Sequence, residues 1–248
     1  DAFFKLEPRF SLKYSPTKQS TFHVSYNYMM QYINLLTNSS IGLPTDLWLP
    51  STSEIPPQLS WQVSTGMQHI FRNGKFQLSL DGYYKKFFNL IEYKEGNSFL
   101  YNKGTNWEER VAQGDGEAYG LEFFLKKQQG KLQGWLAYTL AWSNRNIAEV
   151  NRGKTFPYKY DRRHDVSLWL KWSFTPKKFI STNWVYSTGN ALTLPIGVYN
   201  SPAPSNWTHR YRGSGTWLQN PFDTRPQLSD RNAYRMNSYH RLDVSYQT

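Results

Sequence analysis

The chain has 248 residues and a formal net charge of +11, and its basic residues are scattered among acidic ones, which argues against a nucleic-acid partner. It contains no cysteine, which excludes disulfide frameworks and thiolate metal sites. No run approaches the roughly 18 apolar residues of a membrane-spanning helix, but 17% of the residues are aromatic, and a transmembrane β-barrel, which shows lipid only alternate residues, is compatible with this composition.

Alternating apolar and polar residues predict four β-strands in the first part of the chain. In the first strand, Phe10, Leu12 and Tyr14 alternate with charged and polar residues. Between the third and fourth strands, Asn73 and Gly74 form the Asn-Gly pair that tight hairpins favour. These strands cover about 4–14, 22–30, 59–71 and 76–93.

Five further strands are predicted in the second part. Val166, Leu168 and Leu170 share one face of a strand whose other face is more polar, and a turn at Pro176 reverses the chain. Aromatic residues crowd the strand ends, as they do where a barrel wall meets the two membrane surfaces. The strands of this part cover about 118–127, 132–143, 166–174, 179–186 and 241–246.

Short and long connections alternate along the chain. Short turns are predicted near 15–20, 72–75, 128–131 and 175–178, and long loops near 34–58, 94–117, 144–157 and 187–235. All short turns therefore lie at one end of the strands, as in outer-membrane barrels with short periplasmic turns and long extracellular loops. We predict an all-β fold, an antiparallel transmembrane β-barrel segment formed by residues 1–248.

Nine strands do not close a bacterial barrel. Single-chain barrels have an even number of strands, and an open sheet edge cannot face lipid because its backbone groups would find no water. We expect further strands from other parts of the chain or from another chain.

Several segments resemble the C-terminal half of the barrel of a TonB-dependent outer-membrane receptor. They are LPTDLWLPST, IPPQLSWQVSTGMQHIF, YYKKFFNLIEYKEG, GEAYGLEFFLKKQQGKLQGWLAYTLAWSNR, NRGKTFPYKYDRRHDVSLW and YHRLDVSY. The resemblance implies a barrel of about 22 strands around a plug domain, and the plug is expected outside this sequence. It also implies the cell outer membrane, active import of a scarce ligand (siderophore, cobalamin, glycan or peptide) with TonB-transmitted energy, no enzymatic activity and no cofactor.

Other functions remain open from the sequence. The barrel could be a passive porin-like channel, or a structural subunit of an outer-membrane complex. A soluble all-β carbohydrate-binding domain is the alternative from another class. The expected partners are membrane lipid and lipopolysaccharide, TonB through the plug, and a surface lipoprotein or other outer-membrane subunits.

One polar cluster stands before the seventh predicted strand. Asp161, His164 and Asp165 could be read as metal ligands, but two acids around a single histidine make a poor transition-metal site. A polar cap, with Arg162 and Arg163 pairing to the acids or to lipopolysaccharide phosphates, explains the cluster better. We predict no catalytic residue and no metal site. The residues predicted to contact ligand in the loops and upper lumen are Asp46, Trp48, Trp107, Arg110, Arg162 and His164.

Overall fold

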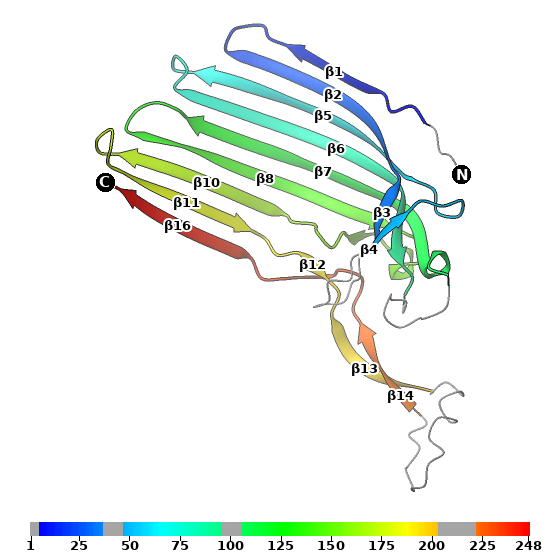
Figure 1. The fold of residues 1–248 in the computed structure, drawn as a ribbon. Helices are drawn as coiled ribbons and strands as arrows, with labels where there is room; N and C mark the ends of the chain where they lie inside the picture. The colour runs from blue at the N-terminus through cyan, green and yellow to red at the C-terminus, as the bar shows by residue number, and fades with distance from the viewer. Residues whose placement is uncertain (1–4, 37–46, 96–105, 203–221) are drawn as a thin grey trace.

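The computed structural model describes residues 5–36, 47–95, 106–202 and 222–248, and most of them form one curved antiparallel sheet (Figure 1). Nine strands follow one another in chain order across this wall, and the two-residue strand β9 (Phe156–Pro157) pairs with β8. The nine are β1 (Arg9–Tyr14), β2 (Ser20–Gln31), β5 (Gln58–Phe71), β6 (Phe76–Tyr93), β7 (Val111–Lys127), β8 (Leu132–Asn146), β10 (His164–Ser173), β11 (Phe179–Ser187) and β16 (Tyr239–Gln247). Short turns join strands at one end, the turn end, and long connections gather at the other, the loop end.

The register of the wall aligns the apolar residues of neighbouring strands. Leu80 pairs with Phe123, Phe123 with Tyr138, Tyr138 with Val166, and Val166 with Tyr186. A slip of one residue would move a whole strand's apolar set to the other face. The alternation seen in each strand is therefore assembled into one continuous apolar face.

The apolar face carries aromatic belts near both ends. At the loop end, ring centroids of Trp61, Tyr84, Tyr119 and Trp142 follow each other at 5.5, 6.3 and 5.2 Å. Leu121, between the belts, is 53% exposed, and in the described residues no second large sheet covers this face. Aromatic belts around an uncovered apolar band are the features of a barrel wall in a bilayer, which argues against a soluble sandwich.

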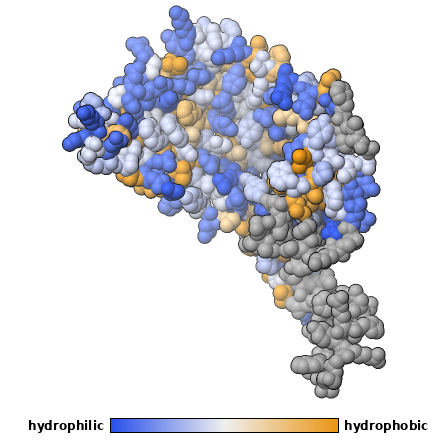
Figure 2. All heavy atoms as spheres, viewed as in Figure 1, coloured by the Kyte–Doolittle hydropathy of each residue, from blue (hydrophilic) through white to orange (hydrophobic). Residues whose placement is uncertain are grey.

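The opposite face is polar and faces the lumen. Ser25 bonds Ser64 with 2.7 Å between their hydroxyl oxygens, and Nε2 of His23 lies 3.1 Å from a carboxylate oxygen of Asp81. Figure 2 shows that hydrophilic residues also gather over the turn end of the wall.

The tight turn between β5 and β6 uses the left-handed region of the backbone. Arg72, Asn73 and Gly74 have φ values of 52°, 54° and 83°. Asparagine and glycine tolerate this region better than most residues. The Asn-Gly pair therefore forms the tight hairpin turn that the sequence pattern predicted.

Gly134 of β8 lies where the backbones of two strands approach closely. A Cβ atom there would clash with the carbonyl oxygen of Trp169 on β10. We expect Gly134→Ala to separate β8 from β10 and to destabilise the wall by about 1–3 kcal/mol, measured as a lower melting temperature of the full-length protein in detergent. Gly82→Ala is the matched control, because its new methyl would lie 3.2 Å from the end of the Leu121 side chain and at an ordinary 3.9 Å from the Gly120 carbonyl oxygen. Equal melting temperatures for the two variants would contradict this reading.

The loop end contains regular elements that the alternation pattern did not predict. β7 also begins at Val111, seven residues before the start predicted from the sequence. The prediction missed these residues because Gly114 and Gly116 interrupt the apolar alternation. The described residues contain no helix long and apolar enough to span a membrane. The additional elements are β3 (Ile33–Leu36), β4 (Leu47–Pro50), η1 (Glu108–Arg110), η2 (Asn151–Gly153), β12 (Ala191–Leu192), β13 (Pro195–Pro202), β14 (Phe222–Leu228) and β15 (Tyr234–Arg235).

Candidate functional site

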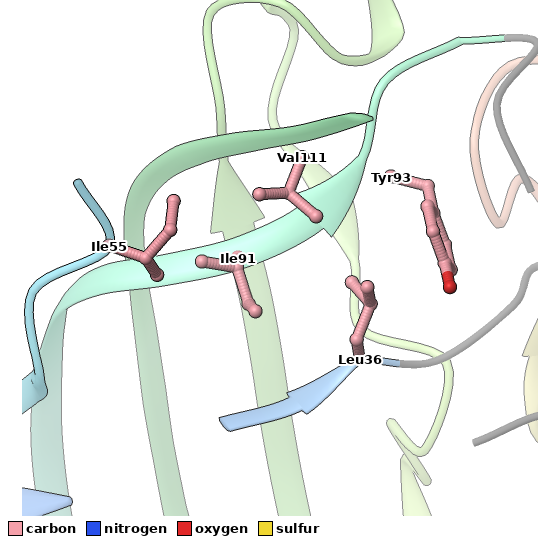
Figure 3. Close-up of a cluster of buried hydrophobic side chains, with 5 residues drawn as sticks. All are labelled: Leu36, Ile55, Ile91, Tyr93 and Val111. Carbon is pink, nitrogen blue, oxygen red and sulfur yellow. The ribbon is translucent and has the colours of Figure 1, made fainter. Parts of the chain in front are cut away.

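An apolar cluster fixes the β3–β4 hairpin to the ends of β6 and β7 (Figure 3). It brings together residues from three separate parts of the chain, and the side chains of Leu49 and Trp107 pack against it. Burial of this cluster removes apolar surface from water and so gives the loop end a core of its own. Its buried members are Leu36, Ile55, Ile91, Tyr93 and Val111.

Hydrogen bonds around η1 add to this anchoring. The Thr52 hydroxyl donates to Glu108, and Asn106 Nδ2 donates to the other carboxylate oxygen of Glu108 at 2.8 Å. Gln113 Nε2 donates to the carbonyl oxygen of Glu54 at 2.9 Å. The hydrogen bond from Thr52, followed by that from Asn106, lowers the pKa of Glu108 from its ordinary value.

The lowered pKa predicts a pH-dependent contact. A carboxyl whose folded pKa is depressed contributes stability above its unfolded pKa and loses it as the pH falls through the folded pKa. We expect the 51–57 segment to exchange amide hydrogens faster, after correction for intrinsic rates, when the pH drops below the ordinary glutamate range. Glu108→Gln should abolish that change. A pH response of the same size in Glu108→Gln would assign it to another group.

A buried carboxylate ties the wall to the segment 229–235. The side chain of Glu92 is 3% exposed and accepts hydrogen bonds from Arg145 Nη1 at 2.6 Å and from Arg231 Nη2 at 2.8 Å. The backbone N–H of Arg231 donates to Asn151 Oδ1 at 2.8 Å. Glu92 thus binds Arg145 of β8 and also Arg231, which lies 139 residues further along the chain than Glu92.

A second buried carboxylate, that of Asp161, also pairs with arginines from two parts of the chain. The side chain of Asp161 is 1% exposed and accepts from the Ser143 backbone N–H at 2.7 Å. Arg235 pairs with this carboxylate and donates to the Asp161 carbonyl oxygen at 2.8 Å, and Arg163 lies 3.5 Å away. We call Glu92, Asp161, Arg145, Arg231 and Arg235 the loop clamp. Removing one partner of a buried ion pair typically costs about 3–5 kcal/mol.

The cluster expected from the sequence does not converge on one point. Asp161 is buried in the loop clamp, whereas His164 begins β10 on the apolar face, where its Nδ1 lies 2.9 Å from the Tyr138 hydroxyl. Asp165 faces Arg162 at 3.9 Å. Among the residues that the structure describes, no group of three or more histidines and acids is placed to hold a metal ion. The arginine pairing expected of a polar cap is present.

The predicted ligand contacts are spread over the loop end. Trp48 is 65% exposed on β4 and borders a shallow groove with Met30, Tyr32 and Ile33, whereas Trp107 packs against the apolar cluster.

Arg110 ends η1, and its carbonyl oxygen accepts from the Lys94 N–H at 2.9 Å. Arg162 donates to Asn190 Oδ1 at 3.0 Å. Asp46 lies outside the described residues. These positions do not test ligand contact, which stays a prediction.

Sequence reasoning did not find the loop clamp. Glu92 is the single acid in the run Leu90-Ile91-Glu92-Tyr93, and a lone carboxylate in an apolar strand end signals a buried partner. Nothing local, however, points to Arg231 as that partner.

An open antiparallel wall with one lipid-facing apolar face, aromatic belts and a polar lumen face defines an outer-membrane β-barrel. The family model described as "TonB dependent receptor-like, beta-barrel" matches residues 2–247. The chain therefore belongs to the TonB-dependent receptors, which are proteins of the Gram-negative outer membrane, and the expected fold class is confirmed.

Relatives of known identity agree with this assignment. Over 118 residues the chain is 28% identical to the TonB-dependent receptor SusC of Bacteroides thetaiotaomicron, a match that covers 44% of this chain and 11% of that protein. The ferripyoverdine receptor of Pseudomonas aeruginosa superposes with a TM-score of 0.57 at 14% identity, covering 96% of this chain and 26% of that one. The FrpB iron transporter of Neisseria meningitidis superposes with a TM-score of 0.56 at 11% identity, covering 97% of this chain and 31% of that one. The chain thus spans a third or less of these proteins.

Proposed function

We propose that this chain forms part of the wall and rim of an outer-membrane receptor that imports a scarce ligand with energy transmitted through TonB. The observation that carries the proposal is the loop clamp, because Glu92 and Asp161 hold arginines of the 229–235 segment and thereby fix the loops into a rim. A fixed rim above a polar lumen face can position a ligand before its import. Family membership supports the same function.

The orientation follows from the same proposal. The short turns face the periplasm and the long loops face the medium, since this asymmetry is typical of outer-membrane barrels. TonB acts through a plug domain outside this sequence. Membrane lipid and lipopolysaccharide surround the wall, and a surface lipoprotein or other outer-membrane subunits are candidate partners at the rim.

No bond is made or broken in this function, so the protein is not an enzyme. The ligand class is a siderophore complex, cobalamin, or a glycan or peptide. Among the predicted contacts, we propose Arg162 as a side chain that meets a solute at the rim, because it is half exposed and adjoins Asp161 of the loop clamp.

The test uses the full-length parent protein in cells that lack their own copy. Uptake of radiolabelled ferric siderophores, cobalamin and oligosaccharides is measured with and without TonB, and we expect accumulation of one class that disappears without TonB. Uptake that persists without TonB, together with steady conductance in planar bilayers, would establish a passive channel. No uptake of any class, with stable co-purification of other outer-membrane subunits, would establish a structural subunit.

A further inference from the structure

All charged residues in the four short turns of the wall are basic. They lie between β1 and β2, β5 and β6, β7 and β8, and β10 and β11, and they contain six basic residues and no acidic residue. Among the long connections, the one between β2 and β5 contains acidic residues and no basic residue, and the other three contain both signs. The turn end therefore accounts for about half of the net charge of +11. The six are Lys18, Arg72, Lys75, Lys131, Lys177 and Lys178.

Aromatic rings lie on the membrane side of these turns. Phe71 and Phe76 pair across β5 and β6, stack with 5.2 Å between ring centroids, and belong to the apolar face. Trp172 and Phe174 form a second such pair at 5.3 Å on β10 and the turn that follows it. Aromatic rings of this kind mark the boundary between acyl chains and headgroups. The basic turns accordingly lie at the level of the headgroups.

Two cations flank the same outward ring. The Arg72 guanidinium lies 5.6 Å from the Phe76 ring centroid, and the Lys127 ammonium lies 5.9 Å from it. Lys127 directly opposes Phe76 in the register and ends the apolar row of β7 that contains Phe123 and Leu125. A lysine in this position keeps its stem on apolar surface and its charge in the headgroup layer.

These cations have no anionic partner in the part of the chain that the structure describes. Among the described residues, no carboxylate lies within ion-pair distance of Arg72, Lys75, Lys127 or Lys131. The turn that holds Lys131 is hydrogen-bonded to the turn that holds Lys75, since the Gln128 N–H donates to the Lys75 carbonyl oxygen at 3.0 Å. Neighbouring turns thus present several unpaired positive charges next to an aromatic surface.

We propose that the turn end is a binding site for anionic phospholipid, with Arg72 and Lys127 holding one headgroup phosphate above the Phe76 ring. Arginine and lysine are the usual phosphate ligands, and the ring gives the adjoining acyl chain an apolar contact. Neighbouring Lys75 and Lys131 strengthen the attraction. Because the proposed orientation places the turns in the periplasm, the ligand is a phospholipid of the inner leaflet, of the phosphatidylglycerol or cardiolipin type.

The experiment uses the full-length protein, delipidated in zwitterionic detergent and incubated with equal amounts of phosphatidylglycerol, phosphatidylcholine and lipid A. Native mass spectrometry counts the lipids retained. We expect preferential retention of phosphatidylglycerol, a several-fold loss of that preference in Arg72→Ala/Lys127→Ala, and weaker retention at high salt. The charge-keeping swap Arg72→Lys/Lys127→Arg should restore it.

The matched control is Lys94→Ala/Lys154→Ala, which removes two basic residues at the loop end. It should keep the preference for phosphatidylglycerol. An unchanged preference in Arg72→Ala/Lys127→Ala, or an equal loss in the control, would refute the site. Retention of lipid A over phosphatidylglycerol that depends on Arg72 and Lys127 would overturn the inner-leaflet assignment, independently of whether the protein imports a ligand.

Discussion

Glu92→Gln is expected to release the 229–235 segment from the wall. The substitution removes the negative charge between Arg145 and Arg231, whose side chains are 11% and 7% exposed, and so removes the carboxylate that neutralises both guanidiniums. Breaking a buried pair in this way costs about 3–5 kcal/mol. Trypsin should then cleave after Arg231 about 100-fold faster or more, since each 1.4 kcal/mol of opening free energy is tenfold in rate. Cleavage is followed by mass spectrometry of the intact protein.

Glu149→Gln is the matched control for this experiment. Glu149 lies 3.0 Å from Lys94 but is 60% exposed, and exposed ion pairs contribute about 0–1 kcal/mol. Its cleavage rate should stay near that of the parent. A third variant, Glu92→Met/Arg145→Met/Arg231→Leu, replaces the charges by apolar groups. Because this variant has no tryptic site at 231, all variants are also compared by cleavage after Arg235, which should be slow again in the third variant. Rapid cleavage after Arg235 in that variant would show that uncompensated buried charge is not the cause of the release.

The wall was predictable because its signal is local. Alternation within each strand fixes which residues share a face, and the turn residues Asn73 and Gly74 fix where the chain reverses. Where the alternation failed, the cause was also local: Gly114 and Gly116 carry no side chain to mark the face, so the beginning of β7 was missed.

The loop end was not predictable in the same way. β3 and β4 are four residues each, and β13 and β14 contain prolines that usually argue against a strand. Their stability comes from contacts between distant segments, such as Leu36 with Ile91 and Glu92 with Arg231. A sequence without an alignment contains no record of such pairs.

Asp161→Asn should loosen the same segment from the other side. The amide cannot balance the Arg235 and Arg163 guanidiniums, and it can accept from the Ser143 N–H with only one oxygen. We expect the free energy that holds the segment on the wall to fall by about 3–5 kcal/mol. The measurements are the rate of tryptic cleavage after Arg235, which should rise, and the melting temperature, which should fall. Asp165→Asn is the matched control, since its carboxylate is 47% exposed and lies 3.9 Å from Arg162. If Asp161→Asn and Asp165→Asn changed the cleavage rate equally, the role of Asp161 in the loop clamp would be contradicted.

The double variant Glu92→Gln/Asp161→Asn tests whether the clamp is one unit. Arg231 and Arg235 are four residues apart on a single segment, so either substitution alone should already open it. The second substitution should then add little, and the combined effect should fall short of the sum by about 0.5–3 kcal/mol. Full additivity would instead mean that Glu92 and Asp161 hold two independent parts of the rim. In that case a ligand at the rim would meet two separately mobile loops rather than one fixed surface.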